Sequence, residues 1–104
     1  MNNDRKTQEK AENAHFMAVL DGAIHEAGLT YIQVDARIGV SEGMTGRWVR
    51  NAQIMRATTF VKVALAVGSD PVELTSRAMK RLKASGLLDD VEILPAVDAE
   101  QPGK

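Results

Sequence analysis

A short central stretch, residues 41–62, combines cationic side chains with a single acid. Arginine can donate two parallel hydrogen bonds to the edge of a guanine, and both arginine and lysine bind phosphate oxygens. This composition favours contact with a polyanion over acid–base or nucleophilic catalysis. The charged side chains of the stretch are Arg47, Arg50, Arg56 and Lys62, against Glu42.

The charge of the whole chain conceals this distribution. Thirteen Lys and Arg against fourteen Asp and Glu give a net charge of −1 over 104 residues. Residues 14–85 carry nine cations and six acids, or +3, whereas residues 86–104 carry five acids and one cation, or −4. A basic body with an acidic tail is typical of a nucleic-acid partner for the body, although small domains also reach such a split by chance.

No constellation of residues predicts catalysis or metal binding. His15 and His25 are ten residues apart, which places them roughly 80° apart around a helix and nearly three turns from each other. The serines have no nearby histidine with a carboxylate partner, and the acids at 89, 90 and 92 lack the glycine and spacing of a calcium loop. There is no cysteine, which excludes disulfides and thiolate metal sites. We expect neither a catalytic residue, nor a metal, nor a cofactor.

Apolar residues recur at three- and four-residue steps along most of the chain, which predicts amphipathic helices. Glycines 28, 39, 68 and 86 follow four of these apolar series and are predicted to end the helices. Four helices are predicted to begin after an N-cap, namely Thr30, Ser41, Thr58 and Asp70. We expect Trp48, Met17, Met55 and Met79 to fill the core. The fold class is all-α in one domain, with helices predicted at 8–27, 31–38, 42–50, 59–67 and 71–84.

No apolar run approaches the ~18 residues needed to span a bilayer, and the polar start shows no signal peptide. These features predict a cytoplasmic protein with no membrane partner.

Residues 29–50 form the most informative stretch, because they predict two short helices around a tight turn at Gly39. Apolar side chains hold this unit to the body, so that one helix protrudes: Val34, Ile38, Val40 and Trp48. A protruding helix fits the major groove of B-DNA, which is about 12 Å wide, and its first residues reach the base edges.

Five short segments carry a resemblance to a known family: Leu29-Thr30, the turn Arg37-Ile38-Gly39-Val40-Ser41, Arg47-Trp48, the run from Lys62 to Gly68, and Glu73-Leu74. With these residues the sequence resembles the Cro/CI-type (XRE-like) helix-turn-helix family, phage-repressor-like, over roughly residues 14–80. The resemblance implies a five-helix lambda-repressor-like bundle and an operator-binding, usually dimeric, regulator.

The resemblance also assigns roles to single residues. Bases would be read by Ser41, Glu42, Gly43, Met44 and Arg47. Phosphates would be bound by Tyr31, Arg50, Asn51, Gln53, Arg56 and Lys62. Two roles remain open for Glu42, which either accepts a hydrogen bond from cytosine or begins the helix with a favourable charge on its dipole.

The sequence departs from the family pattern at four positions. Asp35 stands where the family prefers alanine and Thr45 where it prefers an aliphatic residue, so we expect a buried hydrogen-bonded pair; a local register shift is the alternative. Gly43 and Gly46 are poor helix formers. Close approach to DNA explains Gly43, while close approach and crowding against a neighbouring helix are equal explanations for Gly46.

The chain divides into a flexible start at 1–10, a helix-turn-helix domain at 11–85 and an acidic, apolar C-terminal arm at 86–104. The spare apolar surface of helix 71–84 and the arm predicts a dimer contact through Leu82, Leu87, Leu88, Val91, Ile93 and Leu94. We expect a homodimeric regulator of transcription, of the repressor type, that binds a double-stranded operator. The alternative is an antitoxin-like interaction module whose C-terminal arm binds a partner protein.

Overall fold

The computed structural model describes residues 2–50 and 53–92, with side chains from Arg5 onward. These residues form five α-helices and no strand, which confirms the predicted all-α class and the order of the helices. The helices are α1 (Asn2–Glu26), α2 (Tyr31–Ile38), α3 (Met44–Val49), α4 (Ala57–Ala66) and α5 (Pro71–Ser85).

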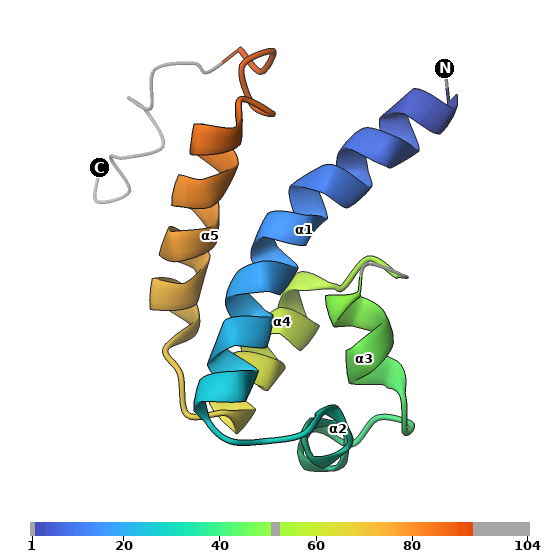
Figure 1. The fold of residues 1–104 in the computed structure, drawn as a ribbon, viewed down its shortest axis with the longest axis vertical. Coiled ribbons are helices and arrows are strands. Elements are labelled where there is room, and N and C mark those ends of the chain that lie inside the picture. Colours follow the sequence, from blue (N-terminus) through green and yellow to red (C-terminus); the bar gives the residue numbers. More distant parts are fainter. Residues whose placement is uncertain (1, 51–52, 93–104) are drawn as a thin grey trace, which may run out of the picture.

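Helix α1 is the long central element of the fold, and it packs against α3, α4 and α5 (Figure 1). Helix α2 contacts α3 and α4, while α5 also contacts α4. In Figure 1, α3 and α5 lie on opposite sides of α1, and α4 crosses behind it. The fold therefore presents α3 and α5 on two different surfaces of the molecule.

The core lies where the apolar stripes of the five helices meet. Phe16 and Phe60 pack edge to face, with their ring centroids 5.8 Å apart, a favourable aromatic geometry. The core positions predicted for Trp48, Met17 and Met55 are confirmed. The buried cluster also contains Leu20, Ala23, Ile24, Val34, Val63, Ala64 and Leu74.

Two predicted side-chain positions are wrong. Met79, expected in the core, is 45 % exposed, and Val61, which belongs to the inward apolar stripe predicted for helix 59–67, is 41 % exposed. The core stripe of α5 runs through Leu74, Ala78 and Leu82 at four-residue steps, and Met79 lies about 60° beyond its edge at Leu82 around the helix axis. Leu82 is itself buried, at 8 % exposure, within a single chain. Little of its side chain is left for the expected dimer contact.

Two helix starts follow local capping chemistry, as predicted. Thr30 Oγ1 accepts a hydrogen bond from the Gln33 amide at 3.1 Å, and Gln33 Oε1 accepts one from the Thr30 amide at 2.8 Å. This reciprocal capping box begins α2. Asp70 Oδ1 accepts from the Val72 amide at 2.9 Å and begins α5, with Pro71 in its first turn.

Three other helix starts differ from the prediction. Helix α1 begins at Asn2 rather than near residue 8, so residues 5–10 of the stretch predicted as a flexible start belong to its exposed first turns. Helix α3 begins at Met44 and α4 at Ala57, two residues after and two residues before the predicted starts. Ser41 and Thr58 are consequently not N-caps.

Among the residues described, no helix combines the length and apolar composition that a bilayer crossing requires.

Candidate nucleic-acid interface

Helices α2 and α3 are the two short helices predicted on either side of a tight turn at Gly39. Gly39 ends α2 in the left-handed conformation, with φ +76°, and its amide donates to the Asp35 carbonyl at 2.9 Å. The Val40 amide donates to the same carbonyl at 3.0 Å. These two hydrogen bonds close the end of α2, and α3 starts after only a few more residues.

The start of α3 is held by Asp35, a carboxylate that is only 2 % exposed. Its Oδ2 accepts a hydrogen bond from the Gly43 amide and its Oδ1 accepts one from the Thr45 amide, both at 2.8 Å. The first amides of a helix have no partner inside the helix, and hydrogen bonds to a charged acceptor are stronger than neutral ones. One side chain of α2 therefore satisfies two amides of α3 and joins the two helices.

The predicted contact between Asp35 and Thr45 is confirmed, but the hydrogen bond does not join the two side chains as expected. Both side chains are buried at the contact between α2 and α3. The bond, however, runs to the Thr45 backbone amide, and among the described residues the buried Thr45 Oγ1 has no hydrogen-bond partner. The contact agrees with the predicted meeting of these two positions, while the alternative of a register shift against the family pattern stays untested.

Gly43 was predicted inside the helix, with Ser41 as the N-cap, but Gly43 itself is the N-cap of α3. Its φ of +99° is a backbone conformation that side-chain-bearing residues rarely adopt, so the backbone itself requires glycine here. Ser41 and Glu42 precede the helix and are exposed, whereas Met44 is half-buried against the core. Because Glu42 lies outside the first turn, its expected interaction with the helix dipole is not supported.

Among the candidate base readers, all of which the structure describes, Arg47 is the one that lies on α3 with an exposed side chain. Its neighbours Gly46 and Trp48 are buried, so the helix turns its inner face to the core and Arg47 to solvent. The guanidinium therefore stands where a ligand lying along α3 would meet it.

Tyr31 connects three helices instead of offering its hydroxyl to a ligand. The phenol donates a hydrogen bond to Asp21 Oδ1 on α1 at 2.7 Å. The guanidinium carbon of Arg50, at the end of α3, lies 5.7 Å from the centroid of the Tyr31 ring, within cation–π range. Phosphate oxygens only accept hydrogen bonds, and the one phenol proton of Tyr31 is donated to Asp21 in this arrangement. The predicted phosphate contact of Tyr31 would require this hydrogen bond to break.

The environment of Tyr31 raises the pKa of its phenol above the ordinary value of 10.0. Partial burial has the largest effect, and the hydrogen bond and negative charge of Asp21 act in the same direction. The positive charge of Arg50 opposes them by lowering the pKa. The phenol thus remains a neutral donor to Asp21 and a neutral face for Arg50.

Gly46 lies beside the contact between Tyr31 and Arg50. It is buried, and a β-carbon at this position would meet Tyr31 Cδ2 at 3.5 Å and Arg50 Nη1 at 3.6 Å. These are ordinary van der Waals distances, so the space around Gly46 would admit an alanine. Crowding against a neighbouring helix therefore does not explain the glycine, and close approach to DNA stays a prediction.

The remaining predicted phosphate residues are more scattered. Gln53 and Arg56 are exposed before α4, and Asn51 lies outside the described residues. Lys62 is exposed on α4, beside Arg37 in a shallow pocket between α2 and α4. The structure thus brings Tyr31 and Arg50 into direct contact, while Lys62 lies beside the end of α2.

Asp21 is the functional residue that the sequence interpretation missed. Besides Tyr31 it meets His25, whose Nδ1 lies 3.2 Å from Asp21 Oδ1 and 2.8 Å from the Asp21 carbonyl oxygen. The four-residue spacing of Asp21 and His25 was visible in the sequence. The partnership with Tyr31 was not, because it crosses the turn at Gly28.

Within the described residues, no group of three histidine or acidic side chains is arranged to hold a metal ion. Comparison with known proteins finds no matching family model, no matching curated protein and no matching solved structure.

Proposed function

We propose that this chain is a sequence-specific, double-stranded-DNA-binding regulator of transcription, of the phage-repressor-like type, with its helices arranged as in the Cro/CI-type helix-turn-helix family. The observation that supports this function most strongly is the mounting of α3. Asp35 ties the start of the helix to α2, Trp48 anchors it in the core, and Arg47 is left exposed. A rigidly held helix with one outward arginine suits recognition in a major groove.

Arg47 is the proposed base reader of this surface. A bidentate contact from its guanidinium to guanine O6 and N7 would contribute roughly 1–3 kcal/mol of discrimination against other bases. Ser41 and Glu42 lie just before α3, are exposed, and would contact neighbouring bases.

Arg50 is the proposed phosphate contact next to the recognition surface. Its stacking on Tyr31 restricts the guanidinium to one side of α3 before DNA arrives. Preorganisation of this kind reduces the entropy cost of binding. Arg56 would add a second phosphate contact from the N-terminal end of α4.

One copy of α3 is too short to specify an operator alone. Its six residues extend over roughly 9 Å at 1.5 Å per residue, which covers only a few base pairs. Two copies bound to half-sites about one helical turn apart, roughly 34 Å, would give useful specificity. The proposed regulator is therefore a cytoplasmic homodimer on a double-stranded operator.

The proposed function is tested by titrating the full chain against duplexes from the upstream region of its own gene and against unrelated duplexes of equal length, over a range of salt concentrations. We expect one upstream fragment to bind at least about 10³-fold more tightly than the unrelated DNA, with affinity falling as salt rises. Uniform weak binding to every duplex would contradict the proposal and favour the antitoxin-like alternative.

A further inference from the structure

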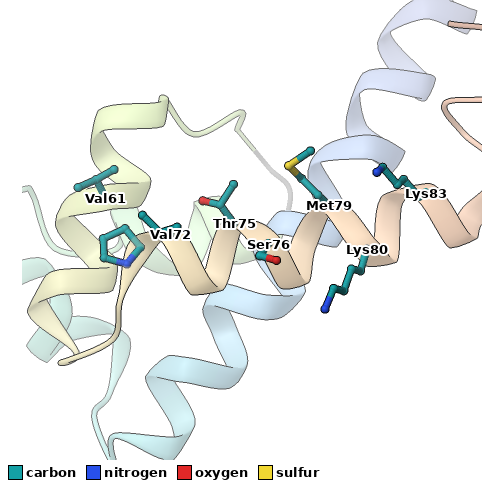
Figure 2. A pocket seen from close by; sticks show the side chains of 8 residues that line it. Val61, Val72, Thr75, Ser76, Met79, Lys80 and Lys83 are labelled. Atoms are coloured by element: carbon teal, nitrogen blue, oxygen red, sulfur yellow. The ribbon is translucent and has the colours of Figure 1, made fainter. Parts of the chain in front are cut away.

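An open apolar groove runs along the face of α5 that does not contact α1. It has a volume of about 500 Å³ and is lined by Val61 of α4 and by residues of α5 (Figure 2). Val72 is 75 % exposed and Met79 45 % exposed in it. Because α5 and α3 lie on opposite sides of α1 (Figure 1), the proposed DNA contacts leave this groove free. Exposed apolar area of this kind is typical of an interaction surface.

The charges of the groove have one sign. Lys80 and Lys83 are the only charged side chains that line it, and both are exposed. Figure 2 places Val61 and Val72 toward one end of the groove and the two lysines toward the other. Within the part of the chain that the structure describes, neither lysine forms an ion pair. A complementary occupant would carry apolar side chains next to carboxylates.

The chain itself contains such a segment directly after α5. In residues 87–92, Val91 is 53 % exposed, Leu87 and Leu88 are half-buried, and the three acids at 89, 90 and 92 are exposed. None of these six residues lines the groove of its own chain. The Leu87 carbonyl instead accepts a hydrogen bond from Gln8 Nε2 at 3.5 Å, which holds the start of the segment beside α1.

We infer that the groove on α5 binds the 87–92 segment of a second copy of this chain, and that the exchange is reciprocal. A two-fold axis near the C-terminal ends of two antiparallel α5 helices makes each contact occur twice, as an isologous interface requires. In this arrangement Val91 of one copy meets Met79 of the other, and the acids at 89 and 90 meet Lys80 and Lys83. Charge complementarity fixes the direction of the overlap and discourages other partners.

This inference extends the proposed function, since an operator with two half-sites needs two copies, and it names the surface that joins them. It corrects the expected dimer contact by replacing Leu82 with Met79 and the lysines, and it keeps Val91. Of the other arm residues expected there, Ile93 and Leu94 lie outside the described residues. The test contains no DNA, so its failure leaves the proposal for α3 standing.

The test measures the dimer dissociation constant of the full chain by sedimentation equilibrium. Two charge-reversed variants are compared with the native chain: Lys80→Glu with Lys83→Glu, and Asp89→Lys with Asp90→Lys. Each reversal puts like charges across the interface twice, so we expect each variant alone to dimerise at least about tenfold more weakly. An equimolar mixture of the two variants restores complementary charges at both contacts, and we expect it to dimerise with native affinity as a heterodimer.

The matched control for the lysine variant is Arg77→Glu with Arg81→Glu. It changes the net charge as Lys80→Glu with Lys83→Glu does, but on exposed residues of α5 outside the groove. We expect this control to dimerise like the native chain. A native chain that stays monomeric at millimolar concentration would overturn the inference, as would a mixture that dimerises no better than its components. Equal weakening by the control would also overturn it, because the effect would then be one of net charge alone.

Discussion

At the scale of single residues, the proposed interface depends on side chains that position other side chains. Tyr31 receives Arg50 on its ring and is itself held by Asp21. Gly46 lies beside the place where Tyr31 and Arg50 meet. Arg50 is thereby restrained by α1 and α2 although it belongs to the end of α3.

This cluster predicts a characteristic titration of Tyr31, the only tyrosine of the chain. The folded pKa is raised, so the tyrosine adds stability below the ordinary pKa near 10 and loses that contribution as the pH rises through the folded pKa. We expect Asp21→Asn to lower the phenol pKa toward its ordinary value, because the negative charge that opposes ionisation is lost. Arg50→Ala is expected to raise it further.

The measurement is the ultraviolet absorption of phenolate as a function of pH, which reports this one residue. The control is Asp70→Asn, which alters an exposed cap of α5 that has no contact with Tyr31. A phenol pKa that does not change in Asp21→Asn would contradict the hydrogen bond between Tyr31 and Asp21.

At the scale of elements, two helix starts follow signals that are local in the sequence. The N-cap at Thr30 and the Asp70-Pro71 start were predicted because cap and capped amide are neighbours in sequence. The start of α3 was not, because its cap is Asp35, a side chain of the preceding helix. The sequence did single out Asp35 as a polar residue between two helices, but spacing alone could not show that it binds amides.

The cap supplied by Asp35 predicts a sharp difference between two aspartates. Asp35 uses both oxygens to accept hydrogen bonds, whereas Asp70 uses one. An asparagine has one acceptor oxygen, so Asp35→Asn leaves one buried amide facing a donor and should lower the free energy of unfolding by about 1–3 kcal/mol.

Asp70→Asn is the matched control, and it should change the free energy of unfolding by no more than about 0.5 kcal/mol because asparagine and aspartate are equally good exposed caps. Urea unfolding followed by the fluorescence of Trp48, the only tryptophan, measures both variants. Equal free energies for the two variants would contradict the role of Asp35 in holding α3.

At the scale of the whole molecule, the distribution of charge is more informative than its sum. The net charge of −1 hides a basic stretch that includes Arg47 and Arg50 and an acidic segment after α5. The separation of the basic stretch from the acidic segment was predicted, because the charged residues of each segment can be counted from the sequence alone. The sequence could not show that α3 and α5 lie on opposite sides of α1 (Figure 1), which allows DNA binding and self-association to use separate surfaces.

The most direct test of this account compares Arg47→Ala and Arg50→Ala on the operator and on unrelated DNA. We expect Arg47→Ala to lower the preference for the operator roughly 5- to 150-fold, because a base contact of about 1–3 kcal/mol is lost. Arg50→Ala should weaken binding to both DNAs alike and reduce the salt dependence by about one phosphate contact. If Arg47→Ala instead leaves the ratio of the two affinities unchanged, α3 does not read bases and the proposed function is wrong.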